Sequence, residues 1–214
     1  MPTSWPTPLR HQYQQWRPLA TPSAVLAELI AVSRDRQRIL DMHVDTENRL
    51  RAIMEAYHPG PLHLFSSLDR DISLEFIRRY PTPAKAARVG ETRMEAFTGC
   101  HGYSGRVPSR VLVDRLSPHL LSGSDGTVAG KSLAANAFAE QLQLLNKHLR
   151  THDQRLRELL DTHPDTPIFT SFPGIGPVIA GVLISEMGEA RERFPSANAL
   201  LAVLTRQVGY AADG

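Results

Sequence analysis

Two glycines and two prolines stand directly before an apolar segment in the last quarter of the sequence. Residues 171–178 read Ser-Phe-Pro-Gly-Ile-Gly-Pro-Val, and the apolar segment continues to Met187. Pro173 is expected to stop a preceding helix, and Pro177 to occupy the first position of the next one, where its missing N–H costs no hydrogen bond. The two glycines are expected to provide positive φ or a close backbone approach that a Cβ would prevent. This pattern predicts a sharp helical hairpin.

Such a hairpin could hold a phosphate through its backbone. The free N–H groups of the turn and the N-terminus of the following helix point the same way, which suits an anionic oxygen. The arrangement is typical of a helix-hairpin-helix element, which binds a nucleic-acid backbone without reading bases. The alternative is a tight turn that only packs two helices, and the apolar Val178 favours it, because such hairpins often carry a basic residue there. The candidate backbone contacts are Gly174, Ile175, Gly176 and Val178.

Positive charge for this site must come from nearby side chains. The sequence has 24 basic and 22 acidic residues and a net charge of +2, so no global field attracts a polyanion. Arg191, Arg193 and Arg206 are the further candidate contacts. On residues 34–51, five arginines are interleaved with acidic residues, which is typical of a solvated helix face, although contact with RNA is the alternative.

Cysteine and carboxylate chemistry is not indicated elsewhere. Cys100 is the only cysteine, which excludes an internal disulfide or a Cys-based zinc site, and we interpret it as a bystander in a loop rather than a catalytic thiol. Asp69, Asp71 and Glu75 cluster where a short helix is expected to begin, so they are interpreted as complementing the helix dipole rather than binding a metal.

The histidines are likewise interpreted structurally. His43 and His152 fall at matching positions on two helical seams and predict a buried, hydrogen-bonded pair rather than metal ligands. His58 and His63 flank Pro-Gly-Pro and are expected to be exposed to solvent.

The elements that would position these residues are all helical. Apolar residues spaced alternately four and three apart predict a long helix from Pro22 to Tyr57, capped by Thr21, and a second from Ser132 to Leu160. The two are expected to pack as an antiparallel helical hairpin, or as a coiled coil between chains. The predicted fold is therefore all-α. A leader at 1–20 is followed by a long helix within 21–60, and short helices, one of them capped by Thr82, lie within 61–129. A flexible joint is expected at 122–131, the second long helix lies within 130–163, and a helix-hairpin-helix domain occupies 164–214.

No 18-residue apolar run and no secretory signal pattern is present, so no membrane partner and a cytoplasmic, nucleoid-associated location are expected.

Several stretches together resemble one family. WRPLATPS, ENRLRAIMEAYHPG, RRYPTPAKAARVGETRMEAFTGCHGYSGR and LLDTHPDTPIFTSFPGIGPVIAGVLISEMGEARERFPSANAL occur in this order. They are similar to the DEDD transposases of the insertion-sequence IS110 family, which are related to the Piv/MooV invertases. The resemblance covers residues 16 to about 207. It implies a RuvC-like domain with four acidic Mg²⁺ ligands, a coiled coil for dimerisation and guide-RNA contact, and a helical domain with a nucleophilic serine.

The sequence departs from this pattern at both ends. No acidic strand pattern precedes Trp16, and Val208 stands where the resemblance places the serine, so a side chain without oxygen replaces the nucleophile. We expect a transposase fragment truncated at both ends, with no cofactor or catalytic residue of its own and inactive alone. Its expected partners are DNA, a structured guide RNA, and a second copy or an intact transposase. The alternatives are a non-catalytic module that pairs with an intact transposase as a regulator, and a helical scaffold whose hairpin only packs.

Overall fold

The protein is described from a computed structural model, which places residues 21–117, 124–189, 194 and 196. Every regular element among these residues is a helix and none is a strand, which confirms the predicted all-α class. Contacts divide the chain into two compact units, which are described separately. The central unit comprises residues 34–154, and the terminal unit comprises residues 1–33 together with 155–214. The predicted leader, 1–20, lies outside the described residues.

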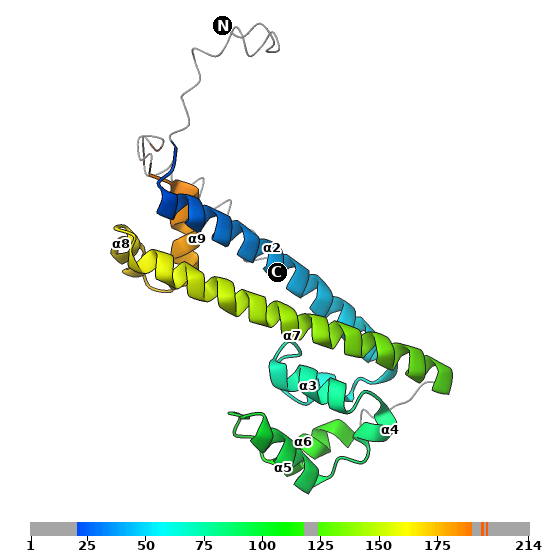
Figure 1. The fold of residues 1–214 in the computed structure, drawn as a ribbon. Helices are drawn as coiled ribbons and strands as arrows, with labels where there is room; N and C mark the ends of the chain where they lie inside the picture. The colour runs from blue at the N-terminus through cyan, green and yellow to red at the C-terminus, as the bar shows by residue number, and fades with distance from the viewer. Residues whose placement is uncertain (1–20, 118–123, 190–193, 195, 197–214) are drawn as a thin grey trace, which may run out of the picture. The chain divides into compact units, whose positions relative to one another are not determined.

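Two long helices, α2 (Ala24–Tyr57) and α7 (Asp125–Asp161), run through both units (Figure 1). The predicted cap of α2 was wrong. Ser23, not Thr21, begins the helix, because its side chain accepts a hydrogen bond from the Leu26 N–H at 3.2 Å. The start of α7 was also wrong, since the predicted flexible joint is helical from Asp125 onward. Ser124 accepts from the Thr127 N–H there, at 3.4 Å, and the acidic Asp125 favours the first turn.

In the central unit α2 and α7 pack antiparallel, and α3 (Asp71–Arg79) packs against them. Contacts pair Arg36 with Asp153 and His43 with Asn146, so position increases along one helix as it decreases along the other. The core between them is formed by Leu50, Met54 and Tyr57 of α2, Leu74 and Ile77 of α3, and Ala135, Ala139 and Leu142 of α7. A coiled-coil supercoil stays a prediction.

Asn146 of α7 provides the polar contact to His43 where the two long helices pack together. His43 Nε2 lies 2.9 Å from Asn146 Oδ1, and Asn146 Nδ2 donates to the backbone carbonyl of Asp69 at 2.8 Å. The predicted pairing of His43 with His152 is therefore wrong. The Nδ1 atom of His152 lies 2.8 Å from the His148 carbonyl of its own helix instead, so it does not reach His43.

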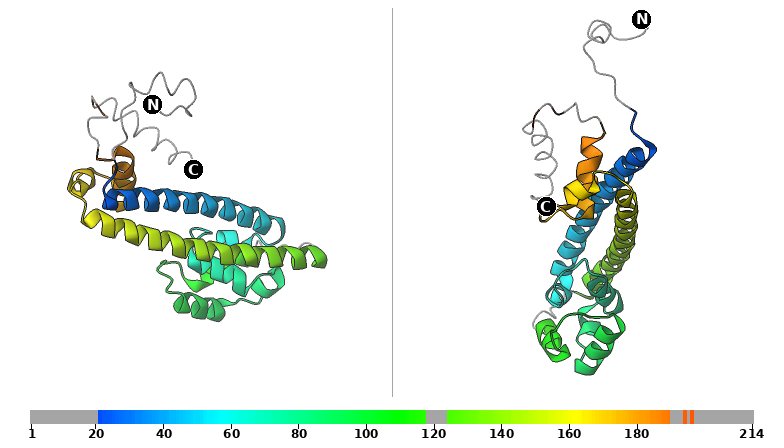
Figure 2. Two further views of the ribbon diagram at one scale, coloured as in Figure 1. Left: turned by 45° about the horizontal axis from the view of Figure 1, so that its top comes forward. Right: turned by 90° about the vertical axis from the view of Figure 1, so that its left-hand side faces the viewer.

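The short helices of the central unit lie beside one another (Figure 2), and their buried side chains form a second core. They are η2 (Gly60–His63, 3₁₀), α3, α4 (Pro83–Ala86), α5 (Glu91–Cys100) and α6 (Ser109–Leu116). The predicted cap at Thr82 is confirmed, since its side chain accepts from the Lys85 N–H at 3.3 Å. Phe76 and Phe97 meet edge to face at 5.4 Å between ring centroids and stay wholly or almost wholly out of solvent. Around them pack Leu64, Phe65, Ala86, Val89, Met94, Leu112 and Leu116.

His58 is buried, with no exposed surface, so its predicted solvent exposure was wrong. The neighbouring Tyr57 explains this burial, because its hydroxyl donates to the Pro81 carbonyl at 2.9 Å and draws the end of α2 against the end of α3. The chain then turns directly into η2, which leaves His58 enclosed. His63 is exposed as predicted.

The terminal unit joins the first turns of α2 and the last turns of α7 to α8 (Thr166–Thr170) and α9 (Pro177–Met187). Its core is formed by Leu26, Leu29, Leu156, Leu159, Leu160, Phe169, Ala180, Leu183, Ile184 and Met187. Gly181 of α9 faces this core, since a Cβ built there would lie in ordinary contact with Leu156, Leu160 and Leu29 at 3.5 to 3.8 Å. In the described residues, no helix is both long and apolar enough to cross a bilayer.

Candidate nucleic-acid interface

The predicted hairpin is formed by α8, a turn at residues 171–176, and α9. Ser171 caps the end of α8, and its N–H donates to the Pro167 carbonyl at 3.2 Å. The Ile175 N–H closes the turn by donating to the Phe172 carbonyl at 3.2 Å. Pro177 lies in the first turn of α9, as predicted, and Gly176 is its N-cap. Pro173 follows the end of α8 by three residues, where a proline prevents its continuation.

The two glycines have different roles in this turn. Gly174 has a φ of 84°, a conformation that L side chains rarely adopt. Gly176 has a φ of −81° with extended ψ, and nothing lies within 4 Å of a Cβ built there. The predicted need for glycine is therefore met by the geometry of Gly174 and is wrong for Gly176.

We expect Gly174→Ala to lower the free energy of unfolding by about 1–2 kcal/mol, because alanine is strained at positive φ. Gly176→Ala is the matched control and should change it by less than about 0.5 kcal/mol. Urea unfolding followed by circular dichroism measures both. Equal effects of the two substitutions would contradict the assigned turn geometry.

Three of the four predicted backbone contacts have an N–H group without an acceptor within the described part of the chain. These belong to Gly174, Gly176 and Val178, whereas the Ile175 N–H is used within the turn. The side chains of Ile175 and Val178 are half-buried against the core of the terminal unit. Of the four predicted contacts, three therefore offer a free donor and Ile175 does not.

Residues 166–205 match the family model "Transposase IS116/IS110/IS902 family". The match begins at the first residue of α8, includes the turn and α9, and continues beyond the described part of the chain.

Three curated relatives are similar over most of the chain. The "Mini-circle putative transposase for IS117" of Streptomyces coelicolor is 27% identical over 205 residues, which are 90% of this chain and 48% of the relative. The "Insertion element IS110 uncharacterized 43.6 kDa protein" of the same organism is 25% identical, over 92% of this chain and 50% of the relative. The "Insertion element IS116 uncharacterized 44.8 kDa protein" of Streptomyces clavuligerus is 22% identical, over 82% and 44%.

The chain thus spans about half the length of these curated relatives. No solved structure matches it. The similarity predicted from the sequence motifs is confirmed at the level of this group of insertion-sequence proteins.

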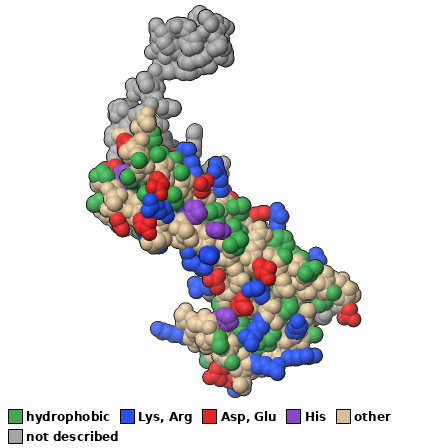
Figure 3. Space-filling model, viewed as in Figure 1, with side chains coloured by type: hydrophobic (Ala, Val, Ile, Leu, Met, Phe, Trp, Pro, Cys, Tyr) green, Lys and Arg blue, Asp and Glu red, His purple; other side chains and the backbone are tan. Residues whose placement is uncertain are grey.

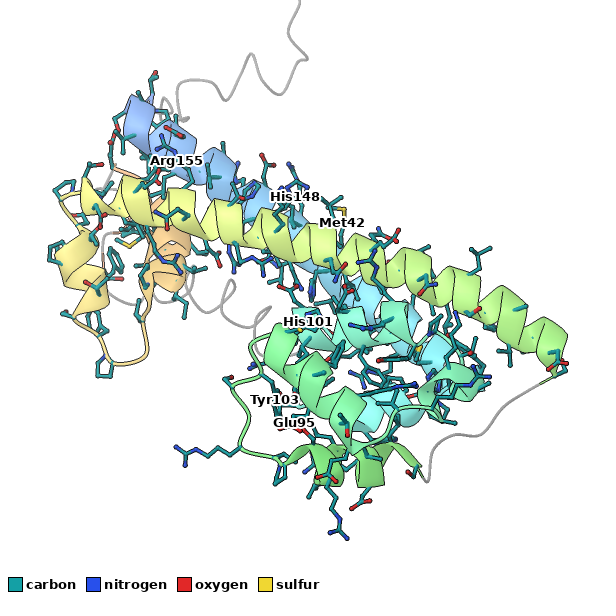
Figure 4. All side chains as sticks on the ribbon, turned by 60° about the horizontal axis from the view of Figure 1, so that its bottom comes forward. Met42, Glu95, His101, Tyr103, His148 and Arg155 are labelled. Carbon is teal, nitrogen blue, oxygen red and sulfur yellow. The ribbon has the colours of Figure 1, made fainter. Side chains whose placement is uncertain are left out.

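Charge around the hairpin is acidic in the described residues of the terminal unit. Arg155 is held by Glu28 at 2.7 Å and Glu158 at 2.9 Å (Figure 4), and its hydrogen bonds to these two carboxylates raise the pKa of the guanidinium. The predicted contacts Arg191, Arg193 and Arg206 lie outside the described residues. The described residues of the terminal unit contain two arginines, Arg155 and Arg157, and no lysine. They contain six carboxylates, Glu28, Glu158, Asp161, Asp165, Glu186 and Glu189.

The hairpin also exposes three large apolar side chains. Ile168 on α8 and Phe172 in the turn are each 55% exposed, and Ile179 in the first turn of α9 is 46% exposed. A protein partner is a natural ligand for exposed apolar groups of this kind.

The arginines of α2 are mostly neutralised within the central unit. Arg38, Arg49 and Arg51 pair with acidic residues three or four positions away, and Arg36 pairs with Asp153 of α7. These contacts agree with a solvated face, and contact with RNA stays a prediction.

The acidic residues near the start of α3 are used in local contacts. Asp71 accepts from Asn146 at 3.1 Å and from Arg150 at 3.0 Å, and Glu75 accepts from Arg78 at 3.1 Å. The described residues contain no group of three or more histidine, cysteine or carboxylate side chains arranged to hold a metal ion.

One concave site in the central unit was not predicted from the sequence. It is lined by residues from the start of α3, the segment after α5, and α6. Its residues are far apart in the sequence, and the only local signal is the pair of glycines in His-Gly-Tyr-Ser-Gly at 101–105.

Proposed function

We propose that this chain is a portion of an IS110-type insertion-sequence transposase that binds the phosphate backbone of nucleic acid through the α8–α9 hairpin. The observation that carries the proposal is that the family match begins at α8 and includes a turn with three free backbone donors. Its partners would be DNA and a structured guide RNA, with a second copy or an intact transposase completing the assembly. The chain by itself would not catalyse strand transfer, and the proposal assigns it no metal.

The first turn of α9 allows a direct test. The exposed Ile179 lies beside the free N–H of Val178, so a charge placed there would act on a bound phosphate. Ile179→Glu should weaken binding of a 20-base-pair duplex about tenfold, and Ile179→Lys should strengthen it. A glutamate there also complements the helix dipole, so the fold should be preserved. Fluorescence anisotropy of the full chain, titrated at low and at physiological salt, measures the affinity.

Leu133→Glu is the matched control, because Leu133 is 75% exposed on α7 and the substitution changes the net charge equally. It should alter the affinity less than about threefold. Equal affinity of wild type, Ile179→Glu and Ile179→Lys would show that the hairpin is not the interface.

A regulatory module that pairs with an intact transposase is the second candidate. It is favoured by the exposed Ile168, Phe172 and Ile179 and by the excess of acidic side chains in the described terminal unit. Retention of an intact transposase by the immobilised chain, lost in Phe172→Ser and accompanied by no nucleic-acid binding, would favour this function over the first.

A further inference from the structure

A groove of about 610 Å³ lies within the central unit, beside the first residues of α3. Its walls come from residues 65–66 and 69–72, from residues 101–105 and Val107 after α5, from Arg115 of α6, and from Asn146 and Arg150 of α7. Its volume is in the range of sites that enclose a small organic ligand. The groove is separate from the hairpin, which belongs to the terminal unit.

The segment after α5 is held in a defined conformation. Gly102 has a φ of 59°, and the Tyr103 N–H donates to the Thr98 carbonyl at 3.0 Å. A Cβ built on Gly105 would overlap the Tyr103 ring, so glycine is required for the ring to lie there. The ring also contacts Phe65, with centroids 5.6 Å apart. His101 and Tyr103 are labelled in Figure 4. The two glycines thus fix an aromatic side chain in the wall of the groove.

Five side chains in the wall of the groove have donor groups that are left unsatisfied. The guanidinium groups of Arg70 and Arg115 make no ion pair, and the hydroxyls of Ser66, Tyr103 and Ser104 make no hydrogen bond, within the described part of the chain. All five side chains can donate to an oxygen. A ligand rich in acceptors and negatively charged would complement them.

The two carboxylates in the wall are already engaged. Asp69 accepts from the Ser67 hydroxyl, and Asp71 accepts from Asn146 and from Arg150. Asp71 thereby uses part of the charge of Arg150, whereas Arg70 and Arg115 keep theirs. Asp69 has no cationic partner in the described part of the chain, so the three guanidinium groups and two carboxylates of the wall leave a net charge of +1.

The short-helix region around the groove is rich in cations (Figure 3). Within residues 60–117, only Arg78 pairs with a carboxylate, and the others form no ion pair in the described part of the chain. Acidic residues in the same range are fewer, so a polyanion would be attracted to this region. The unpaired cations are Arg70, Arg79, Lys85, Arg88, Arg93, Arg106, Arg110 and Arg115.

The rest of the wall is apolar and partly aromatic, with Phe65, Ile72, Tyr103 and Val107. A nucleobase is flat and apolar on its faces, and its phosphate accepts hydrogen bonds, so a nucleotide matches both parts of the groove. We propose that the groove binds one unpaired nucleotide of a single strand, with Arg70 and Arg115 on the phosphate and the aromatic wall against the base. The inference that this nucleotide belongs to a single strand rests on the proposed function. The inference that the groove binds a nucleotide rests on the groove alone.

Anisotropy of the full chain with fluorescein-labelled decamers of uridine and of thymidine tests this proposal, with uridine monophosphate as competitor. The double variant Arg70→Gln/Arg115→Gln should weaken decamer binding at least about tenfold. Arg88→Gln/Arg110→Gln is the matched control, because both arginines are exposed, unpaired in the described chain and absent from the wall. It should weaken binding less than about threefold. Circular dichroism verifies that both variants fold.

Equal affinities of the two double variants for every probe would overturn the proposal. Groove-dependent binding that is no tighter for a decamer than for the mononucleotide would assign the site to a free nucleotide and overturn the strand as its source. Groove-dependent decamer binding without any effect of Ile179→Glu on the duplex would leave this site standing and remove the hairpin proposal. An effect of Ile179→Glu on duplex binding, together with equal decamer affinities of the two double variants, would overturn the groove proposal and leave the hairpin proposal standing.

Discussion

Phe97→Ala is expected to lower the free energy of unfolding of the central unit by about 3–5 kcal/mol, because it removes a whole ring from a closed core. Phe97 is 2% exposed and its ring lies against Phe76 at 5.4 Å, Tyr80 at 6.2 Å and His101 at 4.5 Å between centroids. Few neighbouring side chains could move to fill the space, since they belong to four different short elements. Urea unfolding followed by circular dichroism measures the change.

Val111→Ala is the control, because Val111 is 39% exposed on α6 of the same core region. Its effect should be below about 0.5 kcal/mol. A loss under about 1 kcal/mol for Phe97→Ala would mean that the short helices do not depend on this aromatic core.

The aromatic core also connects stability to the proposed nucleotide groove. Phe65 contacts both Phe97 and Tyr103, and His101 packs on Phe97, so the wall of the groove is an extension of the core. Rigid support of this kind is what positions a binding side chain without a bound ligand. A change in the core should therefore affect the groove before it affects the hairpin of the other unit.

The elements of the fold were largely predictable because their signals are local. Apolar spacing places both long helices, and Thr82 followed by Pro83 marks the start of α4. Pro177 marks the start of α9 in the same way. A cap, a proline or a repeat of apolar residues acts on the few residues beside it, whatever the rest of the chain does.

Partners across the fold were not predictable in this way. The side chain that meets His43 is Asn146, 103 positions away, and spacing on each helix indicates a seam but not its register against the other helix. The start of α7 was missed because glycines at 126 and 130 resemble a joint, whereas Ser124 and packing of the helix stabilise it. The groove needs Arg70, Tyr103 and Arg115 to converge, which only the tertiary structure provides.

His58 is the residue for which burial has the clearest chemical consequence. Its ring has no exposed surface, and neither ring nitrogen makes a hydrogen bond in the described chain. Burial lowers the pKa of His58 to about 4, and the nearby Tyr80 backbone opposes this only in part. Burial outweighs the Tyr80 backbone in setting this pKa, because neither nitrogen of the His58 ring makes a hydrogen bond with that backbone.

This lowered pKa makes stability depend on pH in a defined direction. Because the folded pKa lies below the unfolded value near 6.5, the unfolded chain binds more protons between pH 4 and 6.5. The contribution of a neutral His58 is therefore complete above about pH 6.5 and is lost as the pH falls toward 4. Between pH 7 and pH 5 we expect the free energy of unfolding to fall by about 2 kcal/mol from this residue.

His58→Leu should remove that dependence, because leucine keeps the site filled and cannot bind a proton. Urea unfolding of wild type and variant at several pH values between 5 and 7 gives the difference, in which contributions from other titrating groups cancel. His148→Gln, at an exposed position of α7, is the control and should leave the wild-type slope unchanged. A variant at position 58 with the same slope as wild type would contradict this account, because it would mean that the buried ring keeps a pKa near its unfolded value of 6.5.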